Sequence, residues 1–156
     1  MTDSAALAAF VLRAKRATYA AQGDDATVAP LLAGSRQLEY RERELFYRDV
    51  YVGVARFAGF ETVYEADAPC WSMAYAGGVL AGASQTLMQQ VYAFLRGALQ
   101  RGTADAPFRG PARHESFGYE YVNEWRGTLD EFTGSEVIRR DGGVVYQLTY
   151  AGGRVR

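Results

Sequence analysis

Residue types that often carry chemistry are scarce in this sequence of 156 residues. It contains a single cysteine, Cys70, and a single histidine, His114. These numbers exclude an internal disulfide and a zinc site built from cysteine and histidine. We expect Cys70 to be a small buried filler and His114 to lie in a solvated loop. We therefore predict no metal site and no cofactor.

Charge of one sign and long hydrophobic runs are also missing. The 17 Lys and Arg residues nearly balance the 18 Asp and Glu residues, for a formal net charge of −1. Such a balance does not favour direct binding of nucleic acid or of an anionic membrane surface. No run approaches the roughly 20 apolar residues of a membrane span. The N-terminus lacks the basic region of a signal peptide, so we expect a cytoplasmic protein.

The chain contains an internal repeat rich in tyrosine. With a shift of 75 positions, residues 57–63 superimpose on 132–138 and residues 71–78 on 146–153, without a gap. A shift of 74 places Tyr47, Tyr51 and Gly53 on Tyr121, Trp125 and Gly127. The change of shift predicts a bulge or an altered loop after the glycine. Upstream of these strands, each half also contains an Ala-Pro pair, Ala29-Pro30 in the first and Ala106-Pro107 in the second. We predict two pseudo-repeats, at about 4–80 and 84–156.

Each half begins with a predicted amphipathic helix. Apolar residues recur at helical spacing, and Ser4 and Ser84 stand where an N-cap is expected. Gly23 and Gly102 follow the two helices. The apolar stripes are Leu7, Phe10, Val11 and Ala14 in the first helix, and Leu87, Val91, Leu95 and Ala98 in the second.

The remaining segments alternate as strands do, and they predict hairpins at 67–69 and 141–143. We predict an α+β fold. Two duplicated units of one helix and antiparallel strands form one continuous antiparallel sheet of six to eight strands, with both helices on one face.

One face of this sheet is lined by aromatic and polar side chains. Because small residues such as Ser72, Ala74 and Thr149 lie on the opposite face, we expect the helices there and the aromatic face open. An open aromatic face would form a cleft for a small, flat or cationic ligand. A packed core and a homodimer interface are the alternatives. The predicted ligand-binding residues are Tyr47, Asp49, Tyr51, Trp71, Tyr75, Tyr121, Asn123, Trp125, Tyr146 and Tyr150.

Two glutamates, Glu61 and Glu136, occupy equivalent positions in the repeat. As a symmetric carboxylate pair they are candidates for acid–base catalysis. In the other interpretation each accepts hydrogen bonds or an arginine, for instance Arg48 or Arg126, at the same structural position.

The segments 16–20, 47–53, 57–61, 71–75 and 107–111 occur in this order. Together they resemble a bacterial family of small proteins described only as a domain of unknown function. Some relatives carry a helix-turn-helix, which implies a sensory role, whereas residues 1–20 here predict one helix. The duplicated architecture is also similar to gyrase-inhibitor-like effector-binding domains, which bind flat or apolar cations. Neither resemblance supplies catalytic residues.

Three functions therefore stay open. The first is a module that binds a small aromatic or cationic molecule. The second is an isomerase or hydrolase that uses a glutamate, and the third is a structural or interaction protein with a homodimer through the aromatic face.

Overall fold

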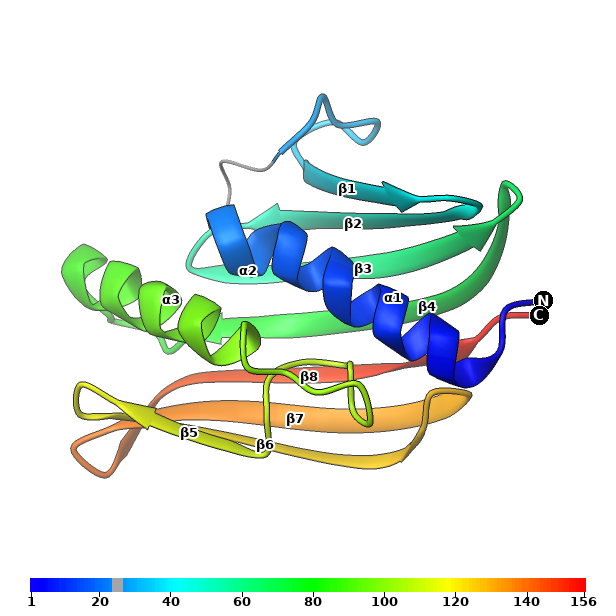
Figure 1. Ribbon diagram of the computed structural model, residues 1–156. Coiled ribbons are helices and arrows are strands. Elements are labelled where there is room, and N and C mark those ends of the chain that lie inside the picture. Colours follow the sequence, from blue (N-terminus) through cyan, green and yellow to red (C-terminus); the bar gives the residue numbers. More distant parts are fainter. Residues whose placement is uncertain (24–26) are drawn as a thin grey trace.

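The computed structural model describes residues 1–23 and 27–156 (Figure 1). Eight strands form one antiparallel sheet in the order β1-β2-β3-β4-β8-β7-β6-β5. The predicted α+β class and the continuous sheet are confirmed. The strands are β1 (Arg36–Glu42), β2 (Leu45–Gly53), β3 (Arg56–Glu65), β4 (Ala68–Val79), β5 (Arg113–Ser116), β6 (Tyr119–Thr128), β7 (Glu131–Arg140) and β8 (Gly143–Arg154).

The helices α1 (Ser4–Ala17), α2 (Tyr19–Gln22) and α3 (Gln85–Leu99) lie on one face of this sheet (Figure 1). Asp3 caps α1, because its carboxylate accepts the Ala6 N–H at 2.9 Å, so the expected cap is one residue off. Ser84 caps α3 as predicted and accepts the Leu87 N–H at 3.1 Å. Within the described residues, none of the helices is both long and apolar enough to cross a bilayer.

The two halves have the same order of elements, a helical segment followed by four strands. They meet at the central pair β4 and β8, where Tyr75 lies opposite Tyr150. These two tyrosines are equivalent in the 75-residue repeat, and the surrounding register pairs Ala74 with Ala151. The repeat in the sequence therefore corresponds to an approximate two-fold axis between the two tyrosines.

The hairpin loops explain why the repeat changes its shift. Three residues separate the paired Gly53 and Phe57, whereas four separate the paired Gly127 and Phe132. The predicted loop change is thus confirmed.

The turns at the opposite end of the strands were predicted less well. Asp141 and Gly142 form the expected turn, with φ of 51° and 79°. In the first half the turn residues are Ala66 and Asp67, one position earlier than expected, because β4 begins at Ala68.

The expected assignment of the sheet faces is wrong: the helices cover the aromatic face. Tyr19 of α2 packs edge-on against Tyr51, and Tyr92 of α3 against Tyr146. Ala74 and Thr149 are exposed on the other face. Each aromatic ring buries about 150–250 Å² and can place its hydroxyl on an interior partner, which small residues cannot match.

Two equivalent glycines let the central tyrosines lie flat over the sheet. Gly59 is the cross-strand partner of Tyr75, and Gly134 that of Tyr150. A Cβ on Gly59 would lie 2.7 Å from the Tyr75 hydroxyl, and one on Gly134 only 2.3 Å from the Tyr150 ring. The register of the tyrosines therefore requires glycine at both positions.

We expect Gly134→Ala to lower the free energy of unfolding by about 1–3 kcal/mol, because the methyl group overpacks the Tyr150 ring. Gly97→Ala in α3 is the matched control, since the nearest atom to its Cβ is 3.9 Å away. The control should gain up to about 1 kcal/mol from helix propensity. Urea unfolding of both variants measures the difference, and equal stabilities would contradict the packing argument.

Candidate functional site

A cavity of about 290 Å³ lies between the helices and the first half of the sheet. Its size is at the lower end of the range for small-molecule pockets. Side chains of α1, α2 and α3, the loop after α3, and the strands β2, β3 and β4 line it. The sheet contributes Tyr47, Asp49, Tyr51, Phe57, Glu61 and Tyr75.

Strand register places two acids on the same part of the cavity wall. Asp49 of β2 and Glu61 of β3 are direct cross-strand partners, and both are buried, with 6% and 3% exposure. Alternation along each strand directs both side chains to the helix-covered face. The Tyr75 hydroxyl donates to Asp49 Oδ1 at 2.6 Å.

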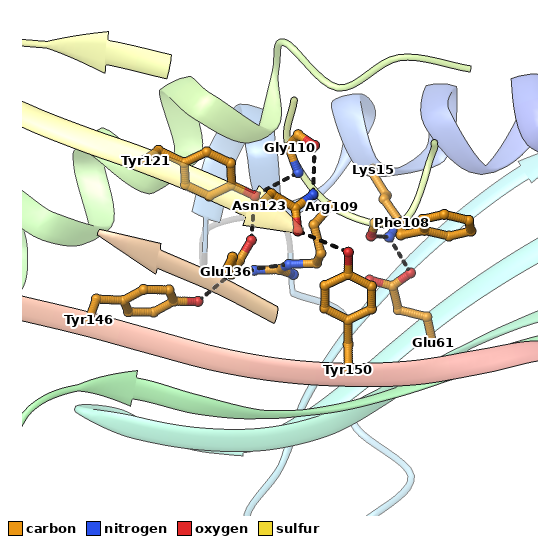
Figure 2. Close-up of polar contacts among 10 residues, drawn as sticks. All are labelled: Lys15, Glu61, Phe108, Arg109, Gly110, Tyr121, Asn123, Glu136, Tyr146 and Tyr150. Atoms are coloured by element: carbon orange, nitrogen blue, oxygen red, sulfur yellow. Dashed lines mark hydrogen bonds and ion pairs between the residues drawn. The ribbon is translucent and has the colours of Figure 1, made fainter. Parts of the chain in front are cut away.

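Glu61 has an incomplete set of partners. Lys15 of α1 places its Nζ 2.9 Å from Glu61 Oε2 as an ion pair, and the same ammonium donates to the Phe108 carbonyl (Figure 2). Among the described residues, Glu61 Oε2 has no partner in hydrogen-bond geometry. The Lys15 ammonium is the one partner of this oxygen among the described residues, and a carboxylate oxygen has two lone pairs, so it can accept a further N–H donor from a ligand.

The local charge is unbalanced on the acidic side. Burial raises the pKa of Asp49 to about 7, and the negative charge of Glu61 adds to this rise. Burial also lowers the pKa of Lys15, which is the cation beside both acids. The end of the cavity that faces solvent is lined by the 58% exposed Val54 and the half-buried Arg96.

The equivalent acid of the second half, Glu136, is fully satisfied. Arg109 contacts its Oε1 through Nη2 at 2.6 Å and Nε at 3.1 Å. Tyr146 donates to the same oxygen at 2.7 Å, and Tyr121 donates to Oε2 (Figure 2). This arrangement matches the interpretation in which an arginine holds the acid.

The arginines that we named for this role lie elsewhere. Arg48 pairs with Glu39 at 2.9 Å, and Arg126 is exposed.

The loop after α3 fills the second half, whereas the described part of its counterpart, residues 27–34, does not fill the first. Residues 106–110 are all buried. Phe108 stacks on Phe132 with ring centroids 4.0 Å apart, and Gly110 donates its N–H to the Tyr121 hydroxyl at 2.9 Å. Residues 27–34, which contain the matching Ala-Pro pair, are all exposed. The cavity therefore lies where the first half lacks this filling loop.

Four of the ten predicted ligand residues line the cavity: Tyr47, Asp49, Tyr51 and Tyr75, together with the candidate acid Glu61. The candidate Glu136 is buried away from the cavity wall. The other predicted ligand residues are also outside this wall: Trp71, Tyr121, Asn123, Trp125, Tyr146 and Tyr150.

Both tryptophans have structural surroundings. Trp71 stacks on Phe132 at 5.8 Å and donates its Nε1–H to the Leu129 carbonyl at 3.2 Å. Trp125 is half-buried and lies in a shallow depression next to Asn123 and Tyr150. Neither tryptophan lines the cavity.

The cavity wall also contains five residues that were not predicted as site residues from the sequence: Lys15, Phe57, Tyr92, Phe108 and Arg109. Lys15 carried a readable signal, because it follows Val11 by four residues and so continues the apolar stripe of α1. Arg109 carried none, since a loop residue reveals its partner only when the loop is placed.

The lone histidine and cysteine take no part in the cavity. His114 lies in β5, not in a loop, and its ring stacks on Phe94 at 5.5 Å. Cys70 is buried at the start of β4, and burial raises the pKa of its thiol. In the described part of the chain, no group of three or more His, Cys, Asp or Glu residues is placed to hold a metal ion.

The fold and site define an α+β protein with helices over one face of a duplicated sheet and an acidic, aromatic cavity beneath them. Residues 49–155 match the family model described as Domain of unknown function (DUF5680). The chain belongs to this family. Searches of curated proteins and of solved structures each gave no match. The matched region begins at Asp49 and includes Glu61, whereas Lys15 precedes it.

We expect Asp49→Asn to be more stabilising at pH 8 than at pH 4. Asn123 already occupies the equivalent position and accepts the Tyr150 hydroxyl at 2.9 Å, so asparagine fits. The pKa of Asp49 is about 7 in the folded protein, against an ordinary value of 3.8. The folded state therefore binds its proton more tightly, and this contribution is lost as the pH rises from about 4 to 7, by up to about 4 kcal/mol.

Denaturant unfolding of both proteins at pH 4 and pH 8 measures this change. The control is Asp141→Asn, whose side chain is 90% exposed. A difference between wild type and Asp49→Asn that is the same at both pH values would contradict the prediction.

Proposed function

We propose that this protein is a binding module for a small organic cation, held in the cavity beneath α1 and α3. The observation that carries the proposal is the buried pair Asp49 and Glu61, which face one cavity with Lys15 as the adjacent cation. If both acids are ionised, this group has a net charge of −1 in a region of low dielectric. A bound cation offsets that charge, and protonation of Asp49 is the alternative.

The rest of the cavity supports a small, partly apolar cation. The rings of Tyr47, Tyr51, Phe57 and Tyr75 form much of the wall and can interact with a positive charge through their faces. Arg109 also lines the cavity, but its charge is balanced by its ion pair with Glu136. The volume of about 290 Å³ favours a small molecule over a macromolecular partner.

We expect the affinity for organic cations to rise with pH through about 7, because Asp49 must lose its proton to attract them. The screen compares amines and guanidines with neutral isosteres by thermal shift. Titration calorimetry then follows the best cation at pH 5.5, 7 and 8.5. Asp49→Asn should weaken binding at pH 8.5 by about tenfold or more, in line with the loss of one buried charge pair, and should flatten the pH profile.

Asp141→Asn again serves as the control and should bind as the wild type does. Equal binding of the neutral isosteres, or an unchanged affinity in Asp49→Asn, would contradict the proposal.

A second candidate function is acid–base catalysis centred on Asp49. A carboxyl group with a pKa of about 7, held by the Tyr75 hydroxyl at 2.6 Å, suits proton transfer near neutral pH. The candidate reactions are isomerisation and hydrolysis of a small molecule. Incubation of each ligand with the protein, followed by mass spectrometry, tests for turnover. Asp49→Asn should abolish turnover, whereas unchanged turnover in this variant would remove Asp49 from the mechanism.

We further propose that the bound cation acts as a signal, in a bacterial and cytoplasmic setting, as the resemblance of the sequence to effector-binding domains implies. Because the helices cover the aromatic face, that face is not available for a homodimer. Any self-association would use another surface.

A further inference from the structure

The second half of the chain holds an aromatic ring and a guanidinium at positions that correspond to the cavity. Phe108 stacks on Phe132 with ring centroids 4.0 Å apart, and Arg109 pairs with Glu136 at 2.6 Å. The ring and the cation are adjacent in the chain and come from one loop. Their partners, Phe132 and Glu136, are four residues apart on β7.

The first half presents the same two partners without the loop. Phe57 and Glu61 are the residues equivalent to Phe132 and Glu136 in the 75-residue repeat. They are also four residues apart on one strand, which corresponds to about 13 Å along the backbone at antiparallel spacing. Both line the cavity. The described part of the corresponding loop is bridged to Gln37 of the edge strand β1 and does not enter the interior, with Leu31 and Leu32 exposed at 78% and 54%.

We propose that the ligand combines a flat apolar ring with a guanidinium, and so occupies the first half as Phe108 and Arg109 occupy the second. The ring lies against Phe57, and the guanidinium lies between Asp49 and Glu61. This inference rests on the proposed function, and it adds the chemical class and the orientation of the ligand.

Unsatisfied acceptors favour a guanidinium over an ammonium. Trp71 stands where the second half has Tyr146, so the hydroxyl that donates to Glu136 has no counterpart at Glu61. Glu61 Oε2 has the Lys15 ammonium at 2.9 Å as its ionic contact, and no second donor reaches it among the described residues. The five N–H donors of a guanidinium form a planar fork that can serve two neighbouring carboxylates, whereas Lys15 already supplies a compact ammonium.

Titration calorimetry at pH 8.5 with four probes tests the chemical class. N-phenethylguanidine carries both groups, butylguanidine lacks the ring, phenethylurea lacks the charge, and phenethylamine replaces the guanidinium with an ammonium. N-phenethylguanidine should bind at least tenfold more tightly than each of the other three.

Two variants test the orientation, each against a matched control. Phe57→Leu should reduce the preference for phenethyl over butyl guanidine by at least threefold, and Phe60→Leu, on the opposite face with 49% exposure, should leave it unchanged. Glu61→Gln should reduce the preference for the guanidine over the urea, and Glu124→Gln at an exposed position should not. Ratios of affinities within one variant are insensitive to a general loss of stability.

The outcomes separate this inference from the proposed function. Equal affinity of N-phenethylguanidine and either butylguanidine or phenethylamine overturns the inference and leaves a cation site. Equal affinity for phenethylurea, or no binding by any probe or any cation of the screen, overturns both. An acetyl-Phe-Arg-amide peptide that binds more tightly than N-phenethylguanidine would assign the site to peptide side chains and overturn the small-molecule class.

Discussion

The buried ion pair between Arg109 and Glu136 is the interaction on which the shape of this protein depends. Glu136 has no solvent exposure, and an isolated ionised carboxylate is very costly in such a place. Two tyrosine hydroxyls and one guanidinium compensate this cost, and the guanidinium comes from the loop after α3. The loop must therefore fold inward, and it carries Phe108 onto Phe132. The interior of the second half around Glu136 is filled as a consequence, and the cavity lies between the helices and the first half of the sheet.

The repeat thus supplies one framework with two different uses. The central tyrosines and their glycine partners are shared, Tyr75 with Gly59 and Tyr150 with Gly134, and they give the same strand register in both halves. The polar residues differ at three points: Asp49 corresponds to Asn123, Trp71 to Tyr146, and the cation at Glu61 comes from a helix instead of a loop. The first difference adds a carboxylate to the first half, and the second removes a hydroxyl donor from its buried glutamate. We infer that one half gives stability and that the other is free to take a ligand.

The alternation of side chains along the strands predicted which residues share a face but not which face the helices cover. Alternation along β2 and β4 correctly grouped Tyr47, Asp49, Tyr51 and Tyr75 on one side. It could not tell which side the helices cover. Small residues allow a helix to approach the sheet closely, whereas aromatic residues gain more buried apolar area under a helix, and the pattern does not say which effect is larger. The helices cover the aromatic side since large rings bury more apolar area and their hydroxyls pair with acids that are buried there.

The sequence by itself determined the order of helices and strands, the duplication, and the set of side chains that share one face. These follow from local periodicity and from glycines at positions that a Cβ would obstruct. Only the tertiary structure decided which cation meets which glutamate and which half keeps a cavity. Lys15 reaches Glu61 from a helix, and Arg109 reaches Glu136 from a loop. Both pairs join residues far apart in the chain, whose partners depend on the path of the intervening loops, and no local pattern records that path.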